Sequence, residues 1–461
     1  MKVIVCGAGQ VGFNIARYLA MENNDVTVID QAADLIGKVN DLLDVQALVG
    51  YASHPDILEQ AGAADADMLI AVTYADEVNM VACQIAHSLF NVPTKIARVR
   101  QQSYLNPMWA DLFSREHLPI DVIISPELEV ARAIGRRMSV PGAFDMILLA
   151  DGMVRVVGVR CSERCPVINT PLRQLTSLFP ELNIIVVGIL RDGEPTVPTS
   201  STQMLAGDEV YFVADTAHLP RAMAAFGHDE KSARKVVVVG GGNIGLNLAR
   251  ELSEARQGIS TKVIEIDRER ARRVAQALPA VTVIQGDALD NDILEEANVA
   301  TAETIVAVSN DDETNILASL LAKRSGVERA VTLINKPSYG PLITTLGIDV
   351  VVSPRAITVS TILQHVRRGR IRSVHSLGDG FAEVIEAEAL ETSPLVGTPL
   401  NEIELPAGVI IGAIVRGGQG GKVIIPRGST VIEGNDRVIL LAMADAVKQV
   451  EKMFAVRLEF F

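Results

Sequence analysis

Two glycine-rich segments have the composition and spacing of a nucleotide-binding turn. The pattern Gly-x-Gly-x-x-Gly occurs at residues 7–12 and again at residues 240–245, each time between a short apolar run and a helix-compatible stretch. Glycine permits the tight turn at the first position, close approach of a pyrophosphate at the second, and packing of the helix on the strand at the third. Anionic oxygens would then lie on the free N–H groups at the helix N-terminus.

An acidic residue follows each turn at a similar distance. Asp30 ends the apolar run after the first turn and Glu265 ends the run after the second, each about 20 residues beyond the third glycine. A carboxylate here can accept hydrogen bonds from the 2′- and 3′-hydroxyls of a ribose, and it repels a 2′-phosphate. Asp267 competes in the second copy, but the spacing to the valine that follows in both copies favours Glu265. The pattern indicates NAD(H), ATP or ADP rather than NADP.

Both features also have a purely structural interpretation. A glycine turn can pack a helix on a sheet without binding a ligand, and a carboxylate at a strand end can be a solvated charge. Nucleotide binding is favoured because the motif occurs twice, each time between a strand and a helix and each time with an acidic partner.

Further candidates follow the ends of other strands, because ligands of open α/β sheets bind beyond the strand C-termini. Thr73 and Ser309 offer hydroxyls, and Arg98 and Arg100 offer guanidinium groups that could pair with phosphates, although each could equally have a structural role. The expected cofactor-binding residues are Gly7, Ala8, Gly9, Gln10, Val11, Gly12, Asp30, Thr73, Tyr74, Arg98 and Arg100 in the first copy, and Gly240, Gly241, Gly242, Asn243, Ile244, Gly245, Glu265, Asp287 and Ser309 in the second.

The two copies differ close to these positions. Leu333 and Asn335 stand where the first copy has its two arginines. Asp287, which could contact an adenine or ribose edge, stands near the position of Tyr51, which could stack on a ligand or simply pack. We therefore expect the two sites to differ in phosphate preference.

We interpret the whole chain as a tandem duplication, because further segments recur in the same order. Residues 71–73 return as 307–309, residues 120–126 as 348–354, and residues 206–210 as 433–438. Each copy begins with apolar runs that alternate with helical stretches, which is typical of a parallel sheet covered on both faces. In the first copy the expected strands are 3–6, 26–29, 47–49, 68–72, 95–99 and 122–124.

The second part of each copy has hairpin signals instead. Asp151-Gly152 and Asp192-Gly193 lie between β-type runs, which favours a small α+β domain. The predicted fold class is therefore α/β, with two tandem copies of a Rossmann-like doubly wound domain, each followed by a small α+β domain. The expected domains are residues 1–140, 141–228, 229–370 and 371–461.

Composition sets outer limits on the function. Of 461 residues, 48 % are hydrophobic and 21 % are charged, which excludes a disordered or fibrous protein. The formal net charge of −14 argues against nucleic acid as a partner. Four cysteines are too few for a disulfide framework, so a reducing cytoplasm is expected. No apolar run approaches the roughly 20 residues that span a bilayer, so any membrane role should be peripheral.

Motifs for catalysis or metal binding are not found in the sequence. None of the seven histidines stands in a recognisable catalytic motif, Cys161 and Cys165 lack a second ligand pair for zinc, and no P-loop occurs. We expect ligand binding without chemistry, with no catalytic residue and no metal. A basic cluster at Arg367, Arg368, Arg370 and Arg372 is either a solvated helix end or a docking patch for an acidic partner or a membrane surface.

This order of motifs over residues 1–455 resembles the family of modules that regulate the conductance of potassium, called RCK or KTN. The resemblance implies RCK-N domains that bind NAD(H) and ATP or ADP, followed by RCK-C domains. It further implies a homo-oligomer, a dimer or a tetrameric ring, on the cytoplasmic face of the membrane under an integral potassium translocator, TrkH or a relative. Departures from the family pattern are Tyr51 in place of an aspartate and Leu333 in place of an arginine.

Two other functions remain open from the sequence. One is an NAD-dependent oxidoreductase of unusual layout, and the other is a nucleotide-sensing scaffold for a different soluble partner. Under the favoured interpretation, moving a gate from 1:99 to 99:1 takes about 5.5 kcal/mol, whereas one site couples by about 1–3 kcal/mol. Several sites must therefore act together, which is the reason to expect an oligomer.

Overall fold

The computed structural model describes residues 1–179, 182–255, 258–339, 342–343, 346–366, 371–378, 380–418 and 420–454. They form two compact units, one made of residues 1–130 and 353–366 and the other of the remaining chain. Arg367, Arg368 and Arg370 of the predicted basic cluster lie outside the described residues, whereas Arg372 pairs with Glu388 at 2.6 Å. Within the described residues, no helix combines the length and the apolar character needed to cross a bilayer.

The first unit contains a parallel sheet of six strands in the order β3-β2-β1-β4-β5-β6. Valine- and isoleucine-rich strands build it, as runs buried on both faces should. Its strands are β1 (Lys2–Cys6), β2 (Asp25–Asp30), β3 (Gln46–Val49), β4 (Met68–Ala71), β5 (Thr94–Arg98) and β6 (Val122–Ile124). Its helices are α1 (Gln10–Met21), α2 (Ala33–Leu42), α3 (Pro55–Gln60), η1 (Ala63–Asp65), α4 (Asp76–Ser88), η2 (Gln102–Leu105) and η3 (Pro107–Phe113), with α5 (Pro126–Met138) beginning here.

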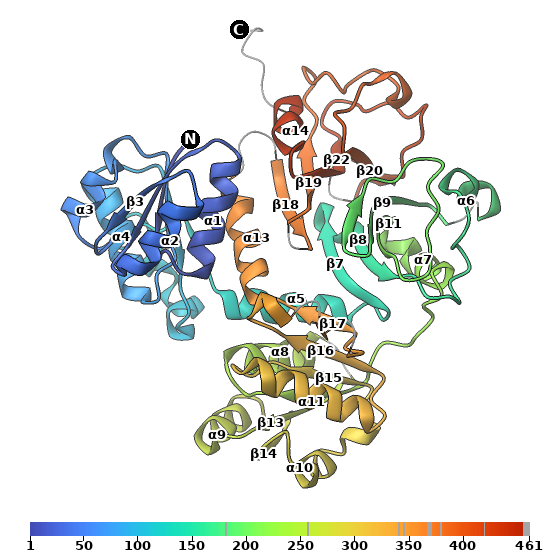
Figure 1. Ribbon diagram of the computed structural model, residues 1–461, viewed down its shortest axis with the longest axis horizontal. Helices are drawn as coiled ribbons and strands as arrows, with labels where there is room; N and C mark the ends of the chain where they lie inside the picture. Colours follow the sequence, from blue (N-terminus) through green and yellow to red (C-terminus); the bar gives the residue numbers. More distant parts are fainter. Residues whose placement is uncertain are drawn as a thin grey trace. The chain divides into compact units, whose positions relative to one another are not determined.

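A helix from the second half of the chain completes this unit. Helix α13 (Pro354–Val366) packs beside α1, which Figure 1 shows as an orange helix against a blue one. Its buried side chains Ile362 and Leu363 join the same core as Ile15 and Leu19 of α1. The first parallel sheet therefore depends on residues more than 200 positions further along the sequence.

The second unit contains a parallel sheet of the same topology, in the order β14-β13-β12-β15-β16-β17. Its strands are β12 (Lys235–Val239), β13 (Ser260–Glu265), β14 (Thr282–Gln285), β15 (Thr304–Ala307), β16 (Arg329–Leu333) and β17 (Val350–Val352). Its helices are α8 (Asn243–Ala255), α9 (Arg268–Ala277), α10 (Asn291–Glu296), η6 (Val299–Thr301), α11 (Asp312–Arg324) and η7 (Pro337–Tyr339). Two sheets with one strand order confirm the predicted duplication.

Two antiparallel sheets of five strands make up the rest of this unit, in the orders β7-β8-β11-β9-β10 and β18-β19-β22-β20-β21. Their strands are β7 (Ala143–Leu149), β8 (Val154–Arg160), β9 (Ile184–Arg191), β10 (Glu194–Thr196), β11 (Glu209–Asp215), β18 (Ile371–Leu377), β19 (Ala382–Glu388), β20 (Val409–Arg416), β21 (Lys422–Ile424) and β22 (Arg437–Met443). The accompanying helices are η4 (Ala150–Gly152), α6 (Leu172–Leu178), η5 (Thr216–His218), α7 (Leu219–Ala225), η8 (Leu400–Glu402) and α14 (Val447–Phe454). The predicted fold class is thereby confirmed.

The two antiparallel sheets share one apolar core. Val187 and Val213 of the first sheet cluster with Ala413 and Leu441 of the second. Gly412 lies so close to Val213 that an added Cβ would clash with that side chain. The small domains are therefore packed face to face, at a spacing that a larger residue at position 412 would not allow.

The repeated acidic position at Asp208 and Asp436 has a structural role in both copies. Asp208 is 2 % exposed and accepts two hydrogen bonds from the guanidinium of Arg191, at 2.9 and 2.8 Å. Asp436 is 1 % exposed and is bonded in the same way by Arg416, at 3.0 and 2.8 Å. A paired buried carboxylate of this kind fixes the strand ends of the small domains.

The packing of α13 makes a testable prediction. Leu363→Ala, at a position that is 2 % exposed, should destabilise the first unit by about 2–5 kcal/mol because it empties part of that core. Trp109 is the single tryptophan and lies in the same unit, so its fluorescence during thermal unfolding reports the effect. Leu42→Ala, at a position 69 % exposed, is the matched control. Equal midpoints for the two variants would contradict the assignment of α13 to this core.

Candidate functional site

A cleft of about 510 Å³ opens at the carboxyl ends of β1, β2 and β4, where the strand order of the first sheet reverses. This is the position at which doubly wound sheets bind ligands. The lining residues that the sequence predicted are Gly7, Gly9, Gln10, Val11, Asp30, Thr73, Tyr74 and Arg98, while Ala8 and Gly12 lie directly beside them in the turn.

The glycine turn needs its first and third glycines for steric reasons. Gly7 has a φ of 110°, a conformation that side chains other than glycine rarely adopt. A Cβ on Gly12 would clash with the carbonyl oxygen of Gly7. The second copy repeats this geometry, with a φ of 101° at Gly240 and the same clash between Gly245 and the Gly240 carbonyl.

The second glycine of each turn faces open space. A Cβ on Gly9 or Gly242 would have no neighbour within 4 Å. Gly9 is the N-cap of α1 and supplies no side-chain hydrogen bond to that helix. The first-turn N–H groups of α1 are thus left without a side-chain cap and are available for an anion.

Asp30 is fixed at the edge of the cleft by the backbone around it. Its two carboxylate oxygens accept hydrogen bonds from the N–H of Ala8 at 2.6 Å and from the N–H of Ala32 at 2.8 Å. Each oxygen keeps further acceptor capacity toward the cleft. The carboxylate is therefore oriented, and it can still accept hydrogen bonds from ribose hydroxyls.

Thr73 and Arg98 are held together by a buried asparagine that the sequence analysis left without a role. Asn79 is 0 % exposed; its Oδ1 accepts from the Thr73 N–H at 2.9 Å, and its Nδ2 donates to the Arg98 carbonyl at 2.9 Å. Asn315 repeats this in the second copy, with Ser309 and Leu333 as partners. The sequence signal for this role is the recurrence of an asparagine six residues after Thr73 and six residues after Ser309.

Arg98 and Arg100 have different surroundings. The Arg98 side chain lines the cleft and donates to the Thr73 carbonyl at 2.9 Å, while its buried Nε has no hydrogen-bond partner among the described residues. Burial lowers the pKa of this guanidinium below its ordinary value. Arg100 is not part of the cleft lining, because its Nε bonds to Glu127 at 2.9 Å.

Two tyrosines border the cleft. Tyr74 is 84 % exposed, and its ring centroid lies 5.5 Å from the guanidinium of Arg100. The Tyr51 ring lies tilted beside that of His54, with ring centroids 5.1 Å apart. Both rings line the cleft and present aromatic surface to it. They offer faces against which an adenine or nicotinamide ring can stack.

The second site repeats the arrangement around the turn. Glu265 accepts a hydrogen bond from the N–H of Gly241 at 2.6 Å and another from the N–H of Asp267 at 2.8 Å, as Asp30 does from its equivalents. Asp267 itself caps helix α9 by accepting from the Arg270 N–H. Glu265 is therefore the geometric counterpart of Asp30.

The remaining candidate residues of the second copy differ in their exposure and in their hydrogen bonds. Asn243 is exposed and Ile244 is half-buried at the start of α8. Asp287 is exposed and accepts from the N–H of Leu289 at 2.9 Å, which shapes the loop after β14. Ser309 stays at the end of β15 and donates from its hydroxyl to the Asp311 carbonyl.

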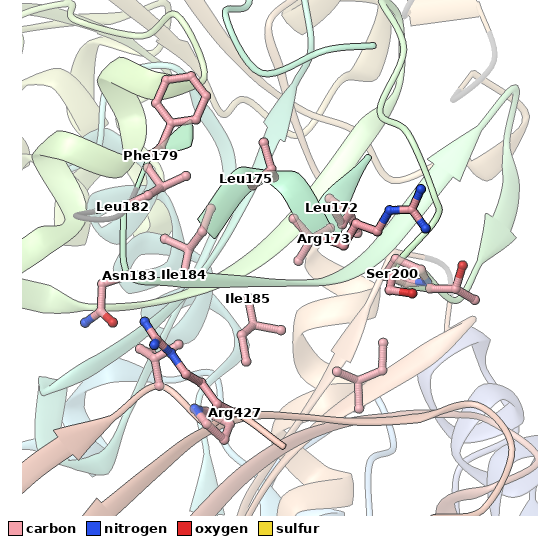
Figure 2. Close-up of a pocket in the computed structure, with 16 residues that line it drawn as sticks. Leu172, Arg173, Leu175, Phe179, Leu182, Asn183, Ile184, Ile185, Ser200 and Arg427 are labelled. Carbon is pink, nitrogen blue, oxygen red and sulfur yellow. The ribbon is translucent and has the colours of Figure 1, made fainter. Parts of the chain in front are cut away.

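A second cavity, of about 360 Å³, lies in the small domains and was not predicted (Figure 2). Its lining is largely aliphatic, with Arg173 from α6 and Arg427 from the loop after β21 as its charged members. It includes no acidic residue and no glycine turn. This cavity therefore lacks the features that mark the ribose-binding site predicted at the parallel sheet.

No metal site is found among the described residues, in which no three His, Cys, Asp or Glu side chains come together. Cys6 and Cys83 are buried in the first unit, and burial raises the pKa of the Cys83 thiol to about 12. A thiol with so high a pKa stays protonated near neutral pH and is a poor nucleophile.

Family models match both halves of the chain. The TrkA-N domain matches residues 3–126 and 236–354, and the TrkA-C domain matches residues 137–227 and 384–455. The Trk system potassium uptake protein TrkA of Azorhizobium caulinodans is 54 % identical over 461 residues, covering 100 % of both chains. The protein of that name from Halomonas elongata is 42 % identical over 465 residues, again with 100 % of both chains covered.

Solved structures share the fold. The RCK domain of GsuK superposes with a TM-score of 0.60 at 18 % identity, covering 99 % of this chain and 95 % of that one. The GsuK channel bound to NAD gives a TM-score of 0.60 at 18 % identity, covering 99 % and 79 %.

Fold and site together define a protein with two dinucleotide-binding-type domains in tandem, each followed by a small antiparallel domain. The chain belongs to the TrkA family of Trk system potassium uptake proteins. This confirms the family resemblance seen in the sequence and places the chain among the potassium uptake proteins of that family.

The turn geometry predicts opposite outcomes for two glycine substitutions. Gly12→Ala should destabilise the first unit by about 1–3 kcal/mol or more, because its Cβ meets the Gly7 carbonyl. Gly9→Ala should leave stability nearly unchanged, because its Cβ meets nothing. Thermal unfolding followed by Trp109 fluorescence distinguishes the two variants. Similar unfolding midpoints would contradict the claim that the contact between Gly12 and the Gly7 carbonyl leaves no room for a side chain.

Proposed function

We propose that this chain is a nucleotide-sensing regulatory subunit that gates a membrane potassium translocator in response to NAD(H) and ADP or ATP. The observation that carries the proposal is the first-site cleft, in which a glycine turn with free helix N–H groups faces an oriented carboxylate, Asp30. This pairing binds the pyrophosphate and the ribose of a dinucleotide. Membership of the potassium uptake family supports the transport role.

Each part of a dinucleotide has a partner in the cleft. The pyrophosphate would lie on the amides that follow Gly9, and the adenosine ribose on Asp30. Arg98, half-buried and without a carboxylate bonded to it among the described residues, would gain a counter-charge from a phosphate. Tyr51 and Tyr74 would supply aromatic contacts.

The lining of the cleft offers few groups for acid–base chemistry on a substrate, namely one carboxylate and the phenol hydroxyls of Tyr51 and Tyr74. Asp30 is the one carboxylate among its lining residues, and no histidine, lysine or cysteine lines it. Because both Asp30 oxygens are bonded by backbone N–H groups, this carboxylate is placed for hydrogen bonding rather than proton transfer. We therefore favour sensing over the alternative of an unusual oxidoreductase.

The proposal places the protein on the cytoplasmic face of the membrane, as a dimer or tetrameric ring bound to an integral translocator of the TrkH type. NAD is bound by the structurally similar GsuK channel and ADP by another GsuK structure, which supports a nucleotide ligand here. A ligand moves a gate only through unequal affinity for its two states. Two nucleotide-binding domains in each of several subunits would supply the several kcal/mol that gating needs.

Substituting Asp30 tests the ribose contact. Asp30→Ala should weaken NADH binding at the first site about ten- to a hundredfold, because hydrogen bonds to a charged group contribute about 1.5–3 kcal/mol each. Calorimetry should be done on a chain that also carries Gly242→Asp. An aspartate at position 242 should cap helix α8 with its own carboxylate and block the second site, so that only binding at the first site is measured. Asp34→Ala, which removes an exposed charge from the neighbouring helix α2, is the control. Unchanged affinity in Asp30→Ala would refute the ribose assignment.

The function itself is tested by transport. We expect a chain with both Gly9→Asp and Gly242→Asp to fold, and to co-purify with its membrane partner, while rubidium uptake in cells lacking other potassium systems no longer follows wild-type regulation. Uptake identical to that of wild type, with both turns blocked, would contradict nucleotide gating. Failure of the wild-type chain to co-purify with an integral membrane protein would contradict the proposal of a membrane partner.

A further inference from the structure

The acidic residue of the second site is covered by an arginine. Arg270 of helix α9 bonds to Oε1 of Glu265 through its Nε at 3.2 Å and through its Nη2 at 3.1 Å. The Glu265 side chain is 4 % exposed, whereas that of Arg270 is 43 % exposed. The carboxylate predicted to hold a ribose is therefore buried beneath a guanidinium that faces the solvent side.

The first copy provides an internal comparison. Its helix α2 begins, as α9 does, just after the acidic strand end, and the position of Arg270 is taken by Leu35, which lines the first cleft. Asp30 accepts one backbone N–H on each oxygen and has no guanidinium bonded to it among the described residues. The longer Glu265 also folds back over Gly241, where a Cβ would come within 3.2 Å of its side chain.

These contacts change what the second site can recognise. Glu265 Oε1 already accepts three N–H groups, from Asp267 and twice from Arg270, and Oε2 accepts one from Gly241. Oε1 is therefore saturated while Oε2 keeps one acceptor position, so the two hydroxyls of a ribose diol cannot both bond to this carboxylate unless Arg270 is displaced. The Nη1 group of Arg270 has no bond to the described residues, and it stands beside the carboxylate that a ribose would approach.

We propose that Arg270 sets the specificity of the second site, making it favour a 2′-phosphorylated adenosine relative to the first site. The guanidinium neutralises Glu265 and adds donors that match a phosphate, while it takes up the acceptors that a free ribose would use. Neutralising the carboxylate and occupying its acceptors both favour a 2′-phosphate over a free ribose hydroxyl. The inference rests on the proposed function, because it requires the second turn to hold a dinucleotide.

The test compares NADPH with NADH at each site separately. Gly9→Asp should leave only the second site and Gly242→Asp only the first, because the added carboxylate takes the anion position at the helix N-terminus. A Cβ at either position has no neighbour within 4 Å, so we expect both variants to fold. The measured quantity is the Kd for NADH divided by the Kd for NADPH, obtained by calorimetry on the full chain. We expect this ratio to be about tenfold or more higher at the second site.

Arg270→Leu, which copies the first site, should remove most of that difference in the Gly9→Asp background. Arg270→Gln, which keeps a polar side chain, should act in the same direction. Arg272→Leu is the matched control, because it removes a charge from the same helix where the partner is the exposed Glu269. Thermal unfolding of each variant verifies that it is folded.

Three outcomes overturn the inference. The ratio is equal at the two sites, or Arg270→Leu leaves it unchanged, or Gly9→Asp binds neither dinucleotide while Gly242→Asp still binds NADH. In the last case the proposed function stands for the first site. If neither protein binds any nucleotide, the proposed function fails as well.

Discussion

The structure of each site depends on one close contact between a helix and a strand. The third glycine of each turn, Gly12 or Gly245, lies against the carbonyl of the first glycine with no room for a side chain. This contact brings the N-terminus of α1 or α8 over the end of the central strand, between the strands that precede and follow it in the sheet. The free amides, the acidic strand end and the hydroxyl of the fourth strand all converge because of it.

Buried polar side chains hold the surrounding loops in place in both copies. Asn79 and Asn315 each tie the end of one strand to the next, and Asp76 and Asp312 each accept N–H groups from the loop after the fifth strand. Such groups are costly to bury unless satisfied, so they specify one loop geometry. The copies therefore share a scaffold and differ at residues beside the turn, which under the proposed function would give the two sites different ligand preferences.

Much of the architecture could be predicted from the sequence because its signals are local. The glycine turns, the apolar strand runs and the recurrence of segments were sufficient to predict doubly wound parallel sheets and their duplication. The packing of α13 on the first sheet was not predictable, because an apolar stripe such as Ile362 and Leu363 shows that a helix is buried but not against which partner. Likewise, the ion pair of Arg270 with Glu265 joins the end of β13 to helix α9. The number of residues between the two does not reveal how the intervening loop turns, so the pair could not be predicted from the sequence.

The central claim is that both glycine turns hold an adenine dinucleotide and leave it unchanged. Hydrogen–deuterium exchange of the full chain, with and without saturating NADH and NADPH, tests this most directly. The account predicts slower exchange at the amides of residues 9–13 and 242–246, with both dinucleotides recovered intact. Protection confined to the cavity around residues 172–185, no protection at either turn, or oxidation of the dinucleotide would contradict it.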